Sequence, residues 1–319
     1  MRRRVFLTGA ALAAAVAALA GWRDYDRVMD RARSALAAAG TPRMAPTRHG
    51  PAEYAEAGEG PPVLMLHGTG GGYDQGLLFA RRLIADGFRV IAPSRFGYLG
   101  TGFPADPSPF VQAEALADLL DHLELARVPV IGGSAGALPA LAMATGQPQH
   151  VSALVAAVPA SFVPGRTPPP PPDAIAGWII RRGLRSDVLI WGALRLSEDR
   201  LIATLLATDP ALVHAAPPDE QARVRAILYG ILPVSLKYRG LLNDAFWAGH
   251  PPDFPLAMIT APTLAISAED DRFGTAEAAR HIARTVPGAE LMMLPDGGHI
   301  WAGHDAKVMA RIAAFLRQV

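Results

Sequence analysis

The stretch "VPVIGGSAGALPALAMA", residues 128–144, carries the strongest structural signal in the chain. An apolar run leads directly into GGSAG at 132–136, and an alanine-rich apolar run follows at once. A short continuous apolar run is typical of a strand buried on both faces, and the second run is long enough for a helix. The stretch therefore predicts a strand, a sharp turn and a helix, with Ser134 at the tip of the turn.

The turn has the spacing G-x-S-x-G, which is found between a strand and a helix when the serine is a nucleophile. In that setting a strained backbone raises the hydroxyl above the sheet. Neighbouring backbone then passes so close that the residues two positions away must be tiny, as Gly132 and Gly136 are. Free N–H groups at the helix start face the same place. We expect Ser134 to be a nucleophile and the Ala135 N–H to be an oxyanion donor; an incidental serine in a glycine-rich turn is the alternative.

Strand and helix patterns alternate on both sides of this stretch. After an expected edge strand and hairpin turn at 52–60, apolar strand patterns occur at 61–68, 88–94, 128–134, 151–159, 261–268 and 289–295. Helical patterns occur between and after them, at 73–87, 109–125, 275–286 and 305–319. Repeated strand–helix units imply right-handed crossovers. The sequence therefore predicts an α/β fold with a mostly parallel, doubly wound sheet.

The alternation stops at residues 160–255. This segment contains five consecutive prolines at 168–172 and several helical patterns, without a convincing strand. A helical insertion inside a continuing sheet is best interpreted as a cap or lid. The predicted organisation is an N-terminal segment at 1–21, a helical linker at 22–44, a core formed by 45–159 and 256–319, and a helical cap at 160–255.

A serine hydroxyl needs a base that is itself held by an acid. In this architecture the acid and then the histidine follow the serine, each at the carboxyl end of a strand. We expect Asp271 to be the acid, because the chain must pass the strand tip before a side chain can reach back; Asp270 is the second choice. We expect His299 to be the base, because two preceding glycines let its loop turn, whereas His304 is typical of a helix start.

The segment HGTGGG at 67–72 follows a buried strand. It lacks the spacing and the Lys-Ser or Lys-Thr pair of a phosphate-binding loop. As an oxyanion loop it is consistent with the rest of the site, with a second N–H from Thr69 or Gly70 opposite that of Ala135. His67 is then expected to hold the loop and not to act in catalysis.

These pieces together resemble the α/β-hydrolase fold superfamily over roughly residues 45–319. The matching motifs are "LHGTGGG", "APSRFGYLGTG", "GGSAG", "SAEDDRFG" and "GGH", in the order of that family. The resemblance implies a cap inserted between the sixth and seventh strands. Arg95 and Tyr98 depart from the Asp-x-x-Gly-x-Gly-x-Ser form that many relatives carry, so their role is left open.

The composition of the chain limits the kinds of function that it can have. The chain has 319 residues, 30 basic and 29 acidic side chains, and no cysteine. A net charge of +1 gives no reason to expect a nucleic-acid partner. Thiolate metal sites are excluded, and no histidine–carboxylate cluster has metal-ligand spacing. We therefore expect a small-molecule substrate and no metal or cofactor; the sequence does not define an oligomeric state.

The N-terminus predicts export. Three arginines at positions 2–4 precede an apolar run to about Gly21, and Ala18 and Ala20 offer a small-x-small cleavage site. The Arg3-Arg4-Val5-Phe6-Leu7 order resembles a twin-arginine signal. The run is slightly short for a bilayer span, so a retained membrane anchor is a close alternative. The expected location is periplasmic or inner-membrane-anchored, with a cytoplasmic location as the alternative.

The reaction expected first is hydrolysis of a small to medium, largely apolar carboxylic ester through an acyl-enzyme. The cap supplies aromatic residues that favour packing or an apolar substrate: Trp178, Trp191, Tyr229, Phe246 and Trp247. A carbon–carbon bond in a ring-cleavage product, a lactone or a thioester would need the same three residues. A non-enzymatic ligand-binding member of the fold is the remaining alternative.

Overall fold

A computed structural model describes residues 2–168, 170, 177 and 182–319, with side chains from residue 16 onward. An eight-stranded sheet forms its centre, in the order β1-β2-β4-β3-β5-β6-β7-β8. From β3 onward all neighbours are parallel, whereas β1 and β2 are antiparallel additions. The strands are β1 (Arg43–Ala45), β2 (Ala52–Ala57), β3 (Pro62–Leu66), β4 (Arg89–Pro93), β5 (Val128–Gly133), β6 (Val151–Ala157), β7 (Thr263–Ala268) and β8 (Glu290–Leu294).

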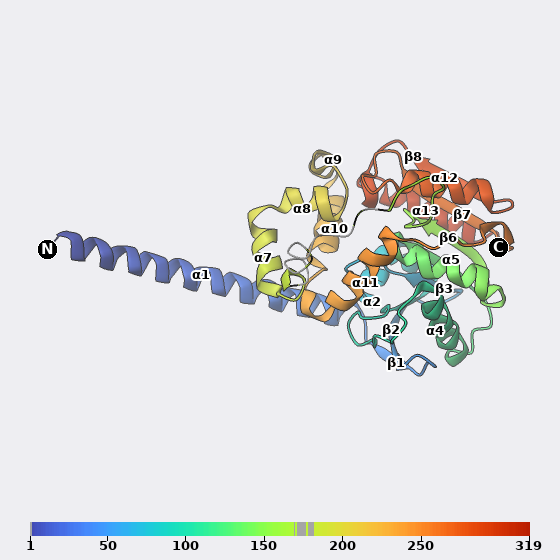
Figure 1. Ribbon diagram of the computed structural model, residues 1–319, viewed down its shortest axis with the longest axis horizontal. Coiled ribbons are helices and arrows are strands. Elements are labelled where there is room, and N and C mark those ends of the chain that lie inside the picture. The colour runs from blue at the N-terminus through green and yellow to red at the C-terminus, as the bar shows by residue number, and fades with distance from the viewer. Residues whose placement is uncertain (1, 169, 171–176, 178–181) are drawn as a thin grey trace.

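Helices cover both faces of the sheet (Figure 1). One buried cluster packs the sheet against α4 (Pro109–His122), α5 (Ala137–Gly146) and α12 (Thr275–Thr285). The other packs it against α2 (Tyr73–Phe79), α3 (Arg81–Ala85) and α13 (Asp305–Leu316). The central strands are buried on both faces because their side chains are mostly apolar. The predicted α/β fold with a doubly wound sheet is confirmed.

The insertion lies between β6 and β7, as predicted, and its described part is helical. The helices are α7 (Asp187–Leu196), α8 (Glu198–Leu205), α9 (Pro210–Ala215), α10 (Pro218–Tyr229) and α11 (Tyr238–Gly249). The first four share a separate apolar cluster that includes Leu194, Ile202 and Val224, whereas α11 contributes Leu241 to a smaller cluster with Tyr98. In Figure 1 these helices lie beside the carboxyl ends of the strands, between the sheet and the projecting part of α1 (Arg2–Ala39).

Buried ion pairs tie this lid to the core. Arg95, which follows β4, pairs with Asp244 of α11, and both side chains are almost fully buried. Lys237, at the start of α11, donates to Asp74 of α2 at 3.2 Å and is fully buried. Burial lowers the pKa of the Lys237 ammonium. Breaking a buried pair by removing one partner is strongly destabilising, so these contacts fix where the lid sits on the core.

The second half of α1 is part of the folded body. Val28 and Met29 are buried within the apolar cluster of the lid. Asp24 accepts hydrogen bonds from Trp191 and Arg195 of α7, one of them from Arg195 Nε at 2.6 Å. The range 22–44, predicted as a helical linker, therefore contains a helix that packs against the lid, followed by the short strand β1.

The first half of α1 projects away from the body (Figure 1). Met1 lies outside the described residues, and the side chains of 2–15 are not described. In the part of the chain that the structure covers, no helix is both long and apolar enough to cross a bilayer. The export signal or anchor at 1–21 stays a prediction.

Three local expectations were wrong. β2 is not an edge strand, because it pairs with β4 on one side and with β1 on the other. The expected hairpin turn after β2 therefore joins strands that are not neighbours. β1 was missed because it has three residues, two of them exposed, and forms only by pairing with β2. The single helix expected at 73–87 is divided at Ala80 into α2 and α3.

Replacing Met29 with alanine tests whether α1 is built into the body. Because the Met29 side chain is 1% exposed, we expect the free energy of unfolding to fall by about 2–5 kcal/mol. Met258→Ala is the matched control, since that side chain is 70% exposed and its loss should cost less than about 0.5 kcal/mol. Urea unfolding of both variants measures the difference, and equal values would show that α1 is only an appended helix.

Candidate active site

The turn after β5 holds Ser134 in a left-handed backbone conformation, with φ of 53°. This conformation is rare for a residue with a side chain, and it directs the hydroxyl away from the strand. Ser134 begins a 3-10 turn, η1 (Ser134–Gly136), which continues into α5. A Cβ on Gly132 would lie 2.6 Å from the Gly136 oxygen, and one on Gly136 would lie 2.4 Å from the Leu66 oxygen. Only glycine fits at either position.

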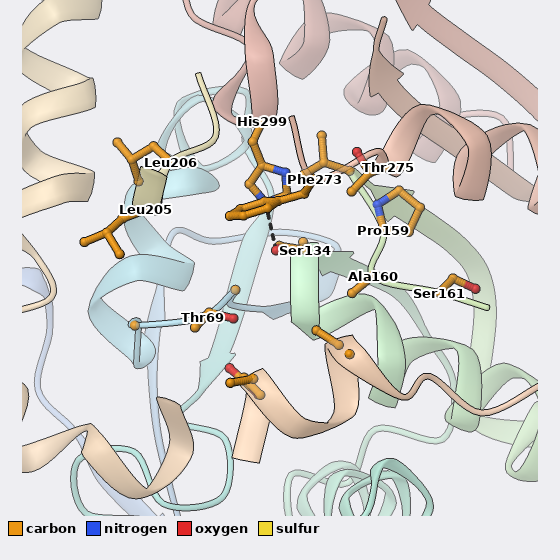
Figure 2. A pocket seen from close by; sticks show the side chains of 18 of the residues that line it. Thr69, Ser134, Pro159, Ala160, Ser161, Leu205, Leu206, Phe273, Thr275 and His299 are labelled. Carbon is orange, nitrogen blue, oxygen red and sulfur yellow. Dashed lines mark hydrogen bonds between the residues drawn. The ribbon is translucent and has the colours of Figure 1, made fainter. Parts of the chain in front are cut away.

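Three side chains from separate strand ends form a continuous chain of hydrogen bonds. The Ser134 hydroxyl lies 2.8 Å from His299 Nε2 (Figure 2). His299 Nδ1 lies 2.8 Å from Asp271 Oδ2. Ser134 follows β5, Asp271 follows β7 and His299 follows β8. This is the arrangement in which a histidine can take the serine proton while a carboxylate orients the ring.

The Asp271 carboxylate is buried and well supplied with donors. Thr275 donates its hydroxyl to Oδ2, and the Phe273 N–H donates to Oδ1 at 2.9 Å. Burial raises the pKa of the Asp271 carboxyl, but the neighbouring His299 ring and these hydrogen bonds lower it by more, so the net pKa lies below its usual value. Asp271 is therefore ionised at neutral pH.

The other candidates have different partners. Asp270 accepts the Gly298 N–H at 2.9 Å and so holds the backbone just before His299. His304 pairs with Asp296 at 2.6 Å and precedes α13. Asp271 and His299, chosen from the sequence, are thus the acid and the histidine that the fold brings to Ser134.

The lid also holds the histidine loop. Arg223 of α10 is almost fully buried and donates from Nη2 to the Ile300 oxygen at 2.8 Å. Its guanidinium also pairs with Glu220 at 2.9 Å and lies 3.7 Å from Asp305 of α13. The residue after His299 is therefore bonded to the lid, while the residue before it is bonded to the core through Asp270.

The glycine loop after β3 lies directly beside the serine. β3 pairs with β5 so that Leu66 faces Gly132, and a Cβ on Gly68 would lie 3.2 Å from the Ser134 Cβ. The Gly70 N–H is already used, since it donates to the Tyr98 hydroxyl at 3.1 Å. In the described part of the chain the Thr69 N–H has no acceptor. Of the two residues predicted to supply the second oxyanion N–H, Thr69 is the one whose N–H is still free to donate to a substrate.

His67 serves the loop. Its Nε2 accepts the Arg95 N–H at 3.0 Å, so Nδ1 carries the proton and donates to the Gly68 oxygen at 2.7 Å. Burial and the nearby Arg95 charge hold the pKa of the His67 ring well below its usual value. A fully buried neutral ring with both nitrogens bonded agrees with the holding role expected from the sequence.

A pocket of about 870 Å³ opens over Ser134 and His299. Figure 2 shows Leu205 and Leu206 on one side of the serine, and Pro159, Ala160 and Ser161 on the other. The lid contributes mainly aliphatic side chains: Leu205, Leu206, Ile227, Leu228, Ile231 and Leu241. Such a lining accommodates an apolar group and leaves water little to bind.

The lid aromatics named from the sequence, as far as the structure describes them, do not line the pocket. Trp191 and Tyr229 donate to Asp24 and Glu198. Phe246 and Trp247 pack edge to face on each other. Trp178 lies outside the described residues. These four described residues therefore follow the packing alternative.

Sequence reasoning missed two partners of the site, Thr275 and Asp244. Thr275 could have been found, because it lies four residues after Asp271 at the start of a predicted helix. Arg95 and Tyr98 were noticed as departures from a family pattern, but their partner was not. That partner, Asp244, is one acid within a long helical insertion, and no local pattern distinguishes it.

Comparison with known proteins gives a family match. The sequence model of the family described as alpha/beta hydrolase fold matches residues 61–302, which is more than half of the chain. The solved structure of an alpha/beta hydrolase fold protein from Nakamurella multipartita superposes with a TM-score of 0.66 and 28% identity. The match covers 87% of this chain and 99% of that one.

Two curated relatives are similar over most of their length. The 2-hydroxy-6-oxononadienedioate/2-hydroxy-6-oxononatrienedioate hydrolase of Paraburkholderia xenovorans is 29% identical over 304 residues, 89% of this chain and 98% of that protein. The 2-hydroxymuconate semialdehyde hydrolase of Pseudomonas putida is 27% identical over 276 residues, 81% of this chain and 87% of that protein. Both are hydrolases by name.

Replacing Gly136 with alanine tests the close approach that forms the turn. The new Cβ would meet the backbone of β3, so we expect unfolding free energy to fall by about 1–3 kcal/mol. Gly146→Ala, at the end of α5, is the control, because its Cβ meets nothing within 4 Å; it should be neutral or stabilise by up to about 1 kcal/mol. Thermal unfolding of the two variants measures the difference. A Gly136→Ala protein as stable as the Gly146→Ala protein would contradict the close approach described for the turn.

Proposed function

This chain belongs to the alpha/beta hydrolase fold family, and on that basis we propose that it is a serine hydrolase that cleaves a carbon–carbon bond next to a ketone. Similarity along nearly the whole of a 2-hydroxy-6-oxononadienedioate hydrolase is the observation that carries the proposal. In a 2-hydroxy-6-oxo compound the 6-oxo carbon is bonded to another carbon of the chain, so hydrolysis at this position breaks a carbon–carbon bond. The sequence alone favoured an ester, and the relatives favour its alternative.

The proposed reaction begins at the serine. His299 Nε2 takes the Ser134 proton while Oγ attacks the ketone carbon, and Asp271 stabilises the imidazolium. The N–H groups of Ala135 and Thr69 stabilise the oxyanion.

Collapse of this intermediate breaks the carbon–carbon bond. The step proceeds from the 2-oxo tautomer of the substrate, in which the 2-hydroxyl proton has moved to the carbon beside the 6-oxo group. The electron pair of the broken bond then moves into the conjugated 2-oxo system of the leaving group, and His299 supplies the proton that the resulting dienolate takes up. Water, activated by the same ring, then hydrolyses the acyl-enzyme to a carboxylic acid. Overall the acyl carbon gains the hydroxyl of one water molecule and the leaving carbon gains its hydrogen.

The pocket supports an apolar substituent on the ketone in place of a second carboxylate. The lid side of the pocket is mostly apolar. Arg166 is the arginine among the lining residues described, and it already donates to the Gly274 oxygen at 2.6 Å and to Glu277 at 3.1 Å. We therefore propose an aryl or alkyl 2-hydroxy-6-oxo-dienoate as the substrate class.

The same observation favours one second candidate. A carboxylic ester needs neither a carboxylate-binding cation nor an electron sink in the leaving group, and an apolar ester matches the aliphatic lining. Ester hydrolysis would use the same serine, histidine, aspartate and backbone donors.

A substrate panel separates the candidates. Purified protein should first be labelled by a fluorophosphonate, with labelling lost in Ser134→Ala. Matched assays then compare an aryl 2-hydroxy-6-oxo-dienoate, its dienedioate counterpart and nitrophenyl esters of rising chain length. We expect the highest kcat/KM for the aryl dienoate; turnover of esters alone would establish the second candidate, and no labelling would refute a serine hydrolase.

The two neighbouring acids should respond differently to the same isosteric change. Asp271→Asn places an amide against His299 Nδ1 and removes the charge that stabilises the imidazolium, so kcat should fall by about 10⁴-fold. Asp270→Asn keeps an oxygen that accepts the Gly298 N–H, so most of the wild-type kcat should remain. Steady-state kinetics on the best substrate gives both values; similar losses in the two variants would contradict the assignment of Asp271.

A further inference from the structure

A carboxylate of the lid reaches the glycine loop through one hydroxyl. Asp244 of α11 accepts two hydrogen bonds from Arg95, at 2.7 Å and 2.5 Å. Arg95 also donates from Nε to the His67 oxygen at 2.8 Å. Asp244 Oδ2 accepts a further bond from the Tyr98 hydroxyl at 2.5 Å. The carboxylate is 3% exposed, so all of these bonds are shielded from water.

The Tyr98 hydroxyl has a fixed direction. It donates to Asp244 and accepts the Gly70 N–H at 3.1 Å. Burial and the Asp244 charge raise the pKa of the Tyr98 phenol well above its usual value, so the proton stays on oxygen. The ring is fully buried, packs edge to face on His67, and leaves no room for a side chain on Gly240 of α11.

These bonds fix the two peptide groups that flank Thr69. The Gly68–Thr69 peptide is held at its carbonyl by His67 Nδ1, and its N–H is the open donor of Thr69. The Thr69–Gly70 peptide is held at its N–H by Tyr98. Because a peptide group is planar, holding one end directs the other. The direction of the Thr69 N–H therefore depends on His67 and on Tyr98, whose hydroxyl is bonded to the lid.

We propose that Tyr98, oriented by Asp244 of the lid, is a positioning residue that aims the Thr69 N–H at the reaction oxyanion. The inference rests on the proposed function, since it requires an oxyanion to stabilise. Arg95 and Tyr98, which replace the usual family pattern, thus link the lid to the catalytic loop, and the lid contributes to transition-state binding without touching the reacting atoms.

Tyr98→Phe tests the link by removing one oxygen. Losing an oxyanion donor outright costs about 10²–10³-fold in kcat, and a misdirected donor keeps part of its effect, so we expect kcat to fall about 10-fold. Affinity for an alkyl trifluoromethyl ketone, which forms a tetrahedral oxyanion with the serine, should fall by about the same factor. KM should change little, because the pocket walls are untouched.

Tyr229→Phe is the matched control. Its hydroxyl donates to a lid carboxylate, Glu198, at 3.1 Å, and Tyr229 is not among the pocket-lining residues described. We expect wild-type kcat and ketone affinity. If Tyr98→Phe fails to fold, Asp244→Asn is measured in the same way, because it removes the charge that orients the Tyr98 hydroxyl and keeps the side-chain shape; it should show the same loss of kcat and of ketone affinity.

The outcomes are distinct. A folded Tyr98→Phe protein with kcat and ketone affinity within twofold of Tyr229→Phe, or with a change confined to KM or thermal stability, would overturn the inference. Fluorophosphonate labelling of wild-type Ser134 in that experiment, together with turnover of the aryl dienoate, would show that the proposed function survives. Absence of labelling in the wild-type protein would refute both.

Discussion

The backbone of β3 and the turn after β5 approach so closely at Gly136 that no side chain fits between them. This contact makes the site possible, because it raises Ser134 above the strand ends and brings the glycine loop after β3 against it. The histidine and the acid can then reach the serine because each follows a strand whose carboxyl end lies at the same edge of the sheet, as the carboxyl ends of parallel strands do. A wider separation would leave the serine, its base and the loop donors on surfaces that do not meet.

The lid is joined to this arrangement by charges that water does not reach. Arg95 with Asp244, Lys237 with Asp74, and Arg223 with Asp305 each join a side chain of the lid to one of the core, and all three pairs are buried. Buried pairs contribute little net stability compared with apolar packing, but a misplaced lid would leave a charge unpaired at considerable cost. Their main effect is therefore to select one position of the lid relative to the serine and to the loops on either side of it.

Much of the fold and site was predictable because the signals are local. The run into Ser134, the acids after one strand and the glycines before His299 each stand within a few residues, and the parallel sheet brings them together. The partners of Arg95 and Tyr98 were not predictable, because Asp244 is almost 150 residues away in a helical insertion. Likewise β1 depends on pairing with β2, and its three residues carry little pattern of their own.

The division within α1 has a consequence for how this protein can be altered. Among its described side chains, burial begins at Val28 and bonding to α7 begins at Asp24. The projecting half of the helix is thus mechanically independent of the interior, although the backbone is continuous. Shortening, exchanging or removing that arm should therefore leave the packing of the body and the geometry around Ser134 unchanged.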